Sequence, residues 1–600
     1  MSEREIGLAS PDGTLEVSVR IARKTGLWGI SYGVRYAGRT LLQDSPLGLV
    51  MDGDTALEGP FEVEVVGRCE HDEWWEPPYG ERSRIRDRYS ELVVLLRERS
   101  HRHRSVRLIF RAYEEGVAFH YAFPERFGNG RLAIREELTT FRFPIGCMAY
   151  EEHGTEGEYV KKSVHELGVR CERPLTVEYP NDMYVCLTEG GLTDFARMLL
   201  TSTGDGAIVA HLDGPVEAEM PFRTPWRAVI IGERPGHLLE RNILVLNLNE
   251  PCALADVSWI KPGKVIREMT LSTAGGKRCV DFAVRMNFQY IEYDAGWYGH
   301  EYDDVSDATF VSVDPDRIKR LDNHDGLDLR EVIDYANRHG IGVLLYVNRR
   351  ALERQLEELL PLYKSWGVKG IKPGFVQVDS QHWTRWLTGL VEKCAEYRLV
   401  LDIHDEHRPT GFSRTYPNLL TQEGIRGNEH FPTARHNATL PFTRYPAGAG
   451  DYTICIYDDR LKTTRAHQLA MAVIAYSPLQ FLFWYDRPEQ YRGEPELDFF
   501  RHVPVTWDDT IVSAGEIGEY AVVARRSGQE WFLGAITNEQ ARSIGVELNF
   551  LDPGRTYRAI RYADGEDGTV IMEQEINRET YWALHMAASG GVAVRFVPES

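Results

Sequence analysis

The chain has 600 residues, of which 43% are hydrophobic and 11% aromatic, and its formal net charge at pH 7 is −21. This length exceeds that of one ordinary domain and predicts about three, each with its own core. The negative charge argues against a nucleic-acid partner, because a phosphate backbone is bound by clustered basic side chains.

The cysteines and the first residues argue against further classes. The eight cysteines are scattered and include no C-x-x-C pair, so zinc-finger and redox-active sites have little support. The segment MSEREIGLASPDGTLEV has no apolar core typical of a signal peptide, and no apolar run is long enough to span a bilayer. We therefore expect a cytoplasmic protein with no membrane partner, or a periplasmic or secreted one if a signal peptide is removed.

Short alternating segments dominate the chain up to about residue 270. Examples are TLEVSVRIA, FEVEVVG and SVRLIFRAY, which are separated by turn clusters such as MDGD and STGDG. Period-two alternation at this spacing indicates antiparallel sheet. It predicts a large N-terminal β-sandwich over residues 1–270.

After STAGGKRC the pattern changes to strands that alternate with helices. FQYIEYDAGW, IGVLLYVN, VKGIKPGF and LVLDIHDEH have the composition of buried strands, and LDLREVIDYANRHG places apolar residues at helical spacing. Such alternation predicts a parallel sheet. No G-x-G-x-x-G follows the first strand, so we favour a (β/α)8 barrel over a doubly wound sheet and place it at residues 271–504.

Alternation of period two returns near residue 505. The segments IGEYAVVARR, EWFLGAI and GVAVRFVP are typical of short antiparallel strands. They predict a small C-terminal β-sandwich over residues 505–600.

Polar residues follow the predicted barrel strands, where the active site of a parallel barrel lies. In chain order they are Asp294, Trp297, Asn348, Lys372, His404, Asp405, Glu423 and Glu429. Glycoside hydrolysis needs one carboxylic acid that protonates the leaving oxygen and a second carboxylate that acts as nucleophile or activates water. Glu429 and Asp405 have suitable positions for these two roles.

Several carboxylates in one pocket would repel one another, which either raises their pKa values or requires a bound cation, and calcium prefers carboxylate oxygens. The HDEH run at residues 404–407 could indicate zinc instead, but His404 and His407 would point to opposite faces of a strand. Among the aromatic residues, we expect Trp297 to stack on a sugar ring, with a place in the core as the alternative.

Five segments carry a resemblance to a known family. They are WWEPPYGE (74–81), YVCLTEGGLTDF (184–195), RTPWRAVIIG (223–232), RPTGFSRTYPNLLTQEGIRGNE (408–429) and LPFTRYPAGAGDYT (440–453). Here the chain resembles glycoside hydrolase family 97, whose known members are α-glucosidases and α-galactosidases. The resemblance implies an N-terminal β-super-sandwich, a (β/α)8 barrel and a C-terminal β-sandwich. It also implies an oligosaccharide or glycoside substrate.

The resemblance also implies roles for single residues. Glu429 matches the general acid, and His404 and Lys372 match positions that contact the substrate. Asp294 and Trp297 are expected to bind the substrate as well. The calcium ligands of the inverting members correspond here to Glu189, Asp405, Glu423 and Glu429. Asp405 stands where those members have a glutamate that also serves as a base.

The stereochemical outcome depends on residue 374. Retaining members carry an aspartate nucleophile in a K-x-D-F pattern, whereas this chain has K-P-G-F, with Gly374 at that position. Inverting members also have glycine there, and the gap leaves room for water. The resemblance therefore implies a calcium-dependent, exo-acting α-glycosidase that inverts configuration, with Glu429 as acid and Asp405 as base.

Asn348 departs from the inverting pattern, because those enzymes have a second base, a glutamate, at its position. Asp405 would then act alone, or Asp379 or Glu406 would replace the missing base. One alternative is a retaining α-galactosidase with a non-standard nucleophile such as Asp379. Another is a glycan-binding homologue without turnover. No motif indicates the preferred sugar or the oligomeric state.

Overall fold

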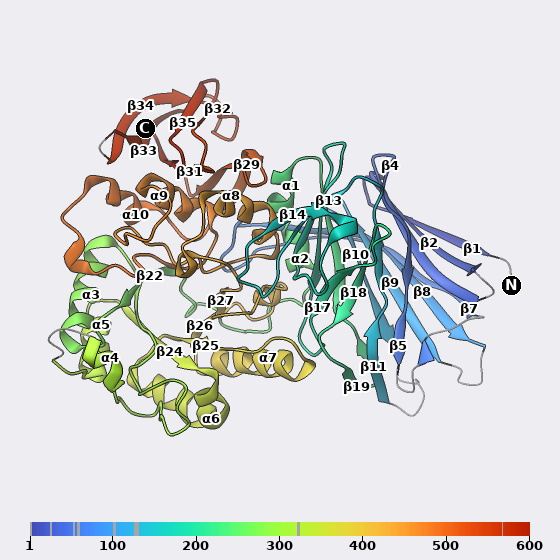
Figure 1. The fold of residues 1–600 in the computed structure, drawn as a ribbon, viewed down its shortest axis with the longest axis horizontal. Helices are drawn as coiled ribbons and strands as arrows, with labels where there is room; N and C mark the ends of the chain where they lie inside the picture. Colours follow the sequence, from blue (N-terminus) through green and yellow to red (C-terminus); the bar gives the residue numbers. More distant parts are fainter. Residues whose placement is uncertain are drawn as a thin grey trace.

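The computed structural model describes residues 3–24, 27–51, 55–56, 61–99, 104–124, 131–320, 325–566 and 568–599. Figure 1 shows three regions in chain order: an N-terminal β region on the right, a barrel on the left and C-terminal strands above the barrel. The predicted succession of sandwich, barrel and sandwich is therefore confirmed. In the described residues, no helix is long and apolar enough to cross a membrane.

The N-terminal region packs a four-stranded sheet, β1–β4, against a ten-stranded antiparallel sheet around one apolar core. In β2, Leu15, Val17 and Val19 point into this core, which is the alternation that the sequence shows. The strands are β1 Arg4–Ala9, β2 Leu15–Lys24, β3 Leu27–Tyr36, β4 Arg39–Leu47, β5 Leu49–Met51, β6 Thr55–Ala56, β7 Phe61–Trp75, β8 Ile85–Glu98, β9 Ser105–Tyr113, β10 Gly116–Phe123, β11 Arg131–Glu137, β12 Thr140–Arg142, β13 Met148–Glu151, β14 Val160–Ser163, β15 Leu175–Glu178, β16 Tyr184–Gly190, β17 Met198–Ser202, β18 Ala207–Leu212, β19 Val216–Glu219, β20 Phe222–Arg223 and β21 Trp226–Gly232.

Seven parallel strands form the barrel sheet in the order β27–β26–β25–β24–β23–β22–β28. Residues 451–454 close the ring, because Asp451 N donates to Gln422 O (3.1 Å) and Ile454 N donates to Phe481 O (3.1 Å). The strands are β22 Gly263–Glu268, β23 Tyr290–Tyr293, β24 Gly342–Asn348, β25 Gly370–Gly374, β26 Val400–Ile403, β27 Leu419–Gln422 and β28 Leu479–Phe481.

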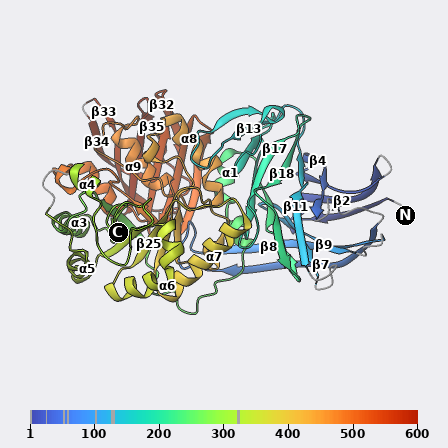
Figure 2. The ribbon, with the colours of Figure 1, turned by 60° about the horizontal axis from the view of Figure 1, so that its bottom comes forward.

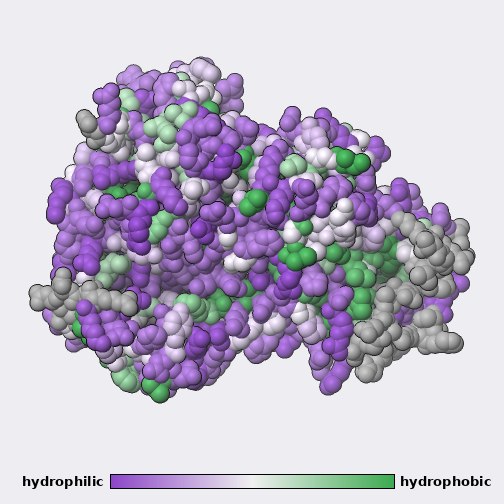
Figure 3. All heavy atoms as spheres, viewed as in Figure 1, coloured by the Kyte–Doolittle hydropathy of each residue, from purple (hydrophilic) through white to green (hydrophobic). Residues whose placement is uncertain are grey.

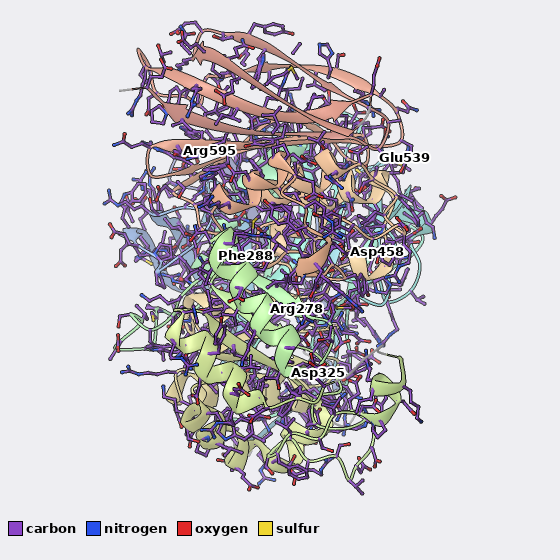
Figure 4. All side chains as sticks on the ribbon, turned by 90° about the vertical axis from the view of Figure 1, so that its left-hand side faces the viewer. Arg278, Phe288, Asp325, Asp458, Glu539 and Arg595 are labelled. Carbon is purple, nitrogen blue, oxygen red and sulfur yellow. The ribbon has the colours of Figure 1, made fainter. Side chains whose placement is uncertain are left out.

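Helices cover the barrel and join it to the neighbouring regions. Figures 1 and 2 show α7 beside the N-terminal strands, and Thr388 Oγ1 donates to Thr193 O across this contact (3.0 Å). Figure 4 shows α3, which carries Arg278, crossing the barrel below the C-terminal strands. The helices are α1 Pro235–Glu240, α2 Ile243–Asn247, α3 Thr273–Met286, α4 Pro315–Arg320, α5 Leu329–Arg338, α6 Arg349–Trp366, α7 Gln381–Glu396, α8 Ala434–Thr443, α9 Arg465–Ile474 and α10 Asp498–His502. Short 3₁₀ helices are η1 Val164–Glu166, η2 Phe412–Arg414, η3 Asn428–His430, η4 Tyr445–Ala447, η5 Pro488–Gln490 and η6 Pro495–Leu497.

The first barrel strand lies before residue 270, the boundary expected from the sequence. β22 pairs in parallel with β23 on one side and with β28 on the other, so it belongs to the barrel. Its sequence, GKVIRE, resembles the sandwich strands that precede it, and only these pairings distinguish it. The barrel sheet therefore begins at Gly263.

The C-terminal region has a six-stranded antiparallel sheet, β29–β30–β31–β36–β33–β34, and a separate pair, β32–β35. It packs against α9, and this contact is close: a Cβ on Gly534 would lie 2.5 Å from Ala470 O. The strands are β29 Asp509–Glu516, β30 Tyr520–Ser527, β31 Glu530–Thr537, β32 Arg542–Glu547, β33 Thr556–Gly565, β34 Gly568–Asn577, β35 Tyr581–Met586 and β36 Gly591–Pro598.

Candidate active site

Lys372 and Asp294 form the floor of the barrel mouth. Asp294 follows β23, and its Oδ2 lies 3.4 Å from Lys372 Nζ on β25 and 3.5 Å from Arg267 Nε on β22. Burial alone would raise the pKa of Asp294, but Arg267 and Lys372 hold it below its ordinary value. Burial would lower the pKa of Lys372, and the surrounding carboxylates, Asp294 first, raise it instead. Both groups are therefore charged.

His404 lies between two carboxylates beside this floor. It follows β26, with Nδ1 2.9 Å from Glu423 Oε2 and Nε2 3.7 Å from Asp451 Oδ2. His404 is only 6% exposed, and burial alone would lower its pKa. Glu423 reverses this effect, so the pKa lies well above its ordinary value and the imidazole is cationic.

Asp405 is fixed by two backbone contacts. Its own N–H donates to Glu423 Oε2 (2.6 Å), and its Oδ2 accepts the N–H of Phe375. The residue has φ +64, a left-handed conformation that turns the chain directly after β26. Burial raises the pKa of Asp405 above its ordinary value.

Glu423 belongs to two overlapping groups of side chains, and the carboxylates of these groups could hold a cation, whereas the cationic His404 could not. Ligand atoms of Glu156, Asp405 and Glu423 lie within 4.8 Å of one another, and so do those of His404, Glu423 and Glu429. A set of crowded carboxylate oxygens is what a hard cation such as calcium prefers, so these carboxylates fit that ion. His407 is in neither group, which leaves the HDEH run without a zinc-like arrangement among the described residues.

Glu189 lies outside this set, contrary to the sequence-based prediction that it binds calcium. It lies on β16 and is 0% exposed. Its Oε1 accepts a hydrogen bond from Arg173, and its Oε2 accepts one from Arg227 (2.6 Å). Arg227 also pairs with Glu137, so Glu189 belongs to a buried ion-pair network in the N-terminal region. Because both carboxylate oxygens already have cationic partners, Glu189 is not a ligand in this arrangement.

Trp297 is not a sugar platform. Its side chain is 0% exposed, its Nε1 donates to Tyr346 O (2.8 Å), and its ring packs against Tyr298. Another tryptophan, Trp484, lies at the site. Lys372 Nζ is 3.8 Å from the centroid of its ring, and Arg267 Cζ is 4.3 Å from it.

Gly374 is not beside an open gap. A Cβ at this position would lie 2.1 Å from Cε2 of Tyr346 and 2.4 Å from its hydroxyl oxygen. The tyrosine on β24 thus fills the space where the side chain of residue 374 would begin. The expectation that the glycine leaves this space for water needs correction, because a phenol occupies it.

The structure does not include Asn348, Asp379 or Glu406 in the carboxylate groups described above. Asn348 ends β24 and caps α6, where its Oδ1 accepts from Arg350 N (3.0 Å). Asp379 is exposed and accepts from Ser380 N (2.8 Å) just before α7. Glu406 is also exposed.

Sequence reasoning missed several charged residues of the site, among them Glu156, Arg267, Asp451 and Glu301. Glu156 comes from the segment EEHGTEGEY in the N-terminal region, and its Oε2 contacts His430 Nε2 at 2.7 Å. Arg267 lies on β22, the strand that was assigned to the sandwich. The only signal for Glu156 was the local density of acidic residues and glycines, which is equally typical of a surface loop.

Three family descriptions match successive parts of the chain. "Glycosyl-hydrolase 97 N-terminal" matches residues 8–251, "Glycoside hydrolase 97" matches 259–425, and "Glycosyl-hydrolase 97 C-terminal, oligomerisation" matches 506–597. Together they cover most of the chain and all three of its regions.

Two relatives match over most of their length. A retaining alpha-galactosidase from Bacteroides thetaiotaomicron is 27% identical over 99% of this chain and 97% of its own. A probable retaining alpha-galactosidase from Streptomyces bingchenggensis is also 27% identical, over 93% and 87%. A solved family 97 enzyme from Pseudoalteromonas sp. strain K8, in complex with acarbose, has a TM-score of 0.91 at 26% identity and covers 99% of this chain and 100% of its own.

Proposed function

The chain belongs to glycoside hydrolase family 97, and on this basis we propose that it is a calcium-dependent, exo-acting α-glycosidase that inverts configuration. Family membership makes it a glycoside hydrolase with a carbohydrate substrate. One observation carries the finer proposal: Glu429 meets Glu423 and His404 at the barrel mouth, with their ligand atoms within 4.8 Å of one another.

Glu429 is the proposed general acid. It lies on η3, in the loop that follows β27, and therefore at the end of the barrel where substrates bind. Its proton passes to the glycosidic oxygen as the bond from that oxygen to C1 breaks. Removal of this proton donor would leave an alkoxide leaving group, which is a poor one.

Asp405 is the proposed base for the attacking water. The N–H of Phe375 donates to its carboxylate and orients it, whereas its own backbone N–H donates to Glu423 and fixes the turn that carries the side chain. In an inverting enzyme the water attacks C1 on the face opposite the leaving oxygen, so the base and the acid lie on opposite sides of the sugar.

The carboxylates of the two groups that share Glu423 would hold calcium: Glu156 and Asp405 in one group, and Glu429 in the other. The bound ion would supply positive charge that offsets the repulsion between these carboxylates and would fix their positions. Three of the four come from the barrel, whereas Glu156 comes from the N-terminal region. The proposed site therefore depends on contact between the two regions.

Lys372, Asp294 and His404 are suited to bind hydroxyl groups of the terminal sugar. Lys372 and a cationic His404 donate hydrogen bonds, whereas Asp294 accepts them. Lys372 and Asp294 are both buried, so the floor of the mouth is closed. A closed floor supports exo action, because only the terminal sugar of an oligosaccharide can enter such a pocket.

The names of related proteins suggest two kinds of terminal sugar. Two relatives are named retaining alpha-galactosidases, whereas solved family members are in complex with acarbose and with panose. We therefore propose terminal α-galactosides and α-glucosides as the substrates to compare first. A panel of aryl α- and β-glycosides tests this, and turnover of β-glycosides alone would contradict the proposal.

Proton NMR of the first product decides the stereochemistry. Inversion predicts that the β-anomer appears first from an α-glycoside, before mutarotation. The names of the two relatives favour a second candidate, a retaining α-galactosidase. That outcome would release the α-anomer first and would require a nucleophile other than the exposed Asp379.

A further inference from the structure

Glu301 is bound by two polar side chains of β24 at the barrel mouth. Its Oε2 accepts a hydrogen bond from the hydroxyl of Tyr346 (2.5 Å) and another from Asn348 Nδ2 (3.2 Å). Asn348 Nδ2 also lies 3.4 Å from the hydroxyl oxygen of Tyr346. Glu301 itself comes from the segment between β23 and α4, so two separate parts of the barrel meet in this triad.

A purely structural role does not account for a carboxylate in this place. Among the described residues, no basic side chain is within ion-pair distance of Glu301. Tyr346 is only 4% exposed, so its hydroxyl depends on Glu301 for a partner. An apolar contact would fill the same space without burying polar atoms. Burial of polar atoms costs free energy unless they are hydrogen-bonded.

The position of the phenol connects this triad to the reaction. The hydroxyl oxygen of Tyr346 would lie 2.4 Å from a Cβ on Gly374. In the retaining pattern, the nucleophilic aspartate begins at that Cβ. The phenol oxygen therefore lies close to the position from which a nucleophile, or a water molecule, would attack C1.

We propose that Tyr346 and Glu301 form a proton relay that accepts the one proton lost by the attacking water. This inference rests on the proposed glycosidase function and refines it, because the attacking water has two hydrogens. Asp405 accepts a hydrogen bond from one of them, and Tyr346 accepts the other. Asp405 then orients and polarises the water through this hydrogen bond, and the hydrogen that it contacts stays on the new hydroxyl group at C1.

The atoms balance as follows. The water oxygen forms a bond to C1 while the bond from C1 to the leaving oxygen breaks, and Glu429 gives that oxygen a proton. One water proton moves to the hydroxyl oxygen of Tyr346, and the original phenolic proton moves to Oε2 of Glu301. Tyr346 ends neutral, so no phenolate has to form.

Glu301 can then return the proton to solvent. It is partly exposed and lines a cavity of about 240 Å³ together with Gly296, His300 and Asp314. Asn348 donates to the oxygen that receives the proton and so orients the carboxylate toward Tyr346. Asn348 therefore has a positioning role. In the family pattern this position holds a glutamate.

The test uses Glu301→Gln, Tyr346→Phe and the control Asp379→Asn, assayed on an aryl α-glycoside with a good leaving group. We expect Glu301→Gln and Tyr346→Phe to lower kcat by about 10²- to 10³-fold, the range for loss of a general base. The control should keep wild-type activity. Sodium azide should restore turnover in both variants and give the β-glycosyl azide, because azide attacks without losing a proton.

The outcomes separate this inference from the proposed function. If wild-type enzyme is active and Glu429→Gln is not, but Glu301→Gln stays within twofold of wild type, the proton relay alone is wrong. A loss of activity that azide does not restore would indicate structural damage and would also overturn the relay. A 2-fluoro-glycoside that labels Tyr346 covalently would make the phenol a nucleophile instead. Absence of wild-type hydrolysis on every α-glycoside would overturn both proposals.

Discussion

The ring of Tyr346 lies against Gly374 so closely that no larger residue fits beside it: a Cβ on Gly374 would be 2.1 Å from Cε2 of the tyrosine. The glycine and the tyrosine are therefore one packing unit on neighbouring strands, β25 and β24. The absence of a nucleophile at residue 374 and the presence of the phenol are two aspects of the same arrangement.

Gly374→Asp should destabilise the protein, because the new side chain would collide with Tyr346. Forcing extra atoms into a packed site costs about 1–3 kcal/mol. In a Tyr346→Ala background the same substitution should cost much less, since the ring is gone. Thermal unfolding of the four proteins gives the coupling energy between the two positions. Additive shifts would show that the two residues do not compete for space.

Glu429→Gln should abolish hydrolysis of substrates with poor leaving groups. The loss should shrink for aryl glycosides such as dinitrophenyl glycosides, whose leaving oxygen needs no proton. For substrates with poor leaving groups we expect kcat/KM to fall at least about 10²-fold, the lower range for general acid catalysis. Glu392→Gln, which changes an exposed carboxylate on α7, is the control. Equal losses on both substrate types would assign Glu429 another role.

Glu156→Gln should weaken calcium binding, whereas Glu189→Gln should not. Glu156 belongs to the carboxylate group at the mouth, whereas Glu189 is held by Arg173 and Arg227. Isothermal titration of EDTA-treated protein with calcium measures the first effect. Glu189→Gln should instead lower the free energy of unfolding by about 3 kcal/mol, because it leaves buried arginines without a partner. The reverse result would restore Glu189 as a ligand.

Trp484 should matter for catalysis and Trp297 for stability. Lys372 and Arg267 both stack on the ring of Trp484, so Trp484→Leu would release two cations of the site floor. We expect kcat/KM to fall about tenfold or more, given roughly 1–2 kcal/mol for a buried cation–π contact. Trp297→Phe removes a buried hydrogen bond and should lower the melting temperature while kcat/KM changes little. Steady-state kinetics and thermal unfolding of both variants check this contrast.

His467 should make the protein less stable in mild acid. Burial lowers its pKa to about 4, and its Nε2 accepts a hydrogen bond from Asn437 Nδ2 (3.0 Å). Between pH 6.5 and 4 the unfolded chain binds a proton that the folded chain does not, so stability falls as pH falls through this window. The loss is on the order of 3 kcal/mol at its lower end.

His467→Gln removes this titration but keeps a donor and an acceptor. Its melting temperature should therefore depend less on pH between 4 and 6.5 than that of the wild type. Parallel pH profiles for the two proteins would mean that His467 does not contribute to acid sensitivity.

Much of the site was predictable because it follows single strands. Lys372, His404 and Asp405 each lie at or just beyond the C-terminal end of a strand whose apolar composition marks it clearly. The carboxyl ends of parallel strands meet at one edge of the barrel, so these side chains had to come together. Glu423 and Glu429 are predicted in the same way, since Glu423 directly follows β27 and Glu429 lies in the loop after it.

The sequence by itself determined the order of the three regions, the family and the barrel carboxylates, because period, strand ends and long motifs are local properties. Only the tertiary structure decided the rest. Glu156 reaches the site from another region, Glu189 is bound by distant arginines, and Glu301 meets Tyr346 across a long connection. Each of these contacts joins residues far apart in the chain. Packing chooses such partners through shape and charge in three dimensions, and no spacing along the sequence records that choice.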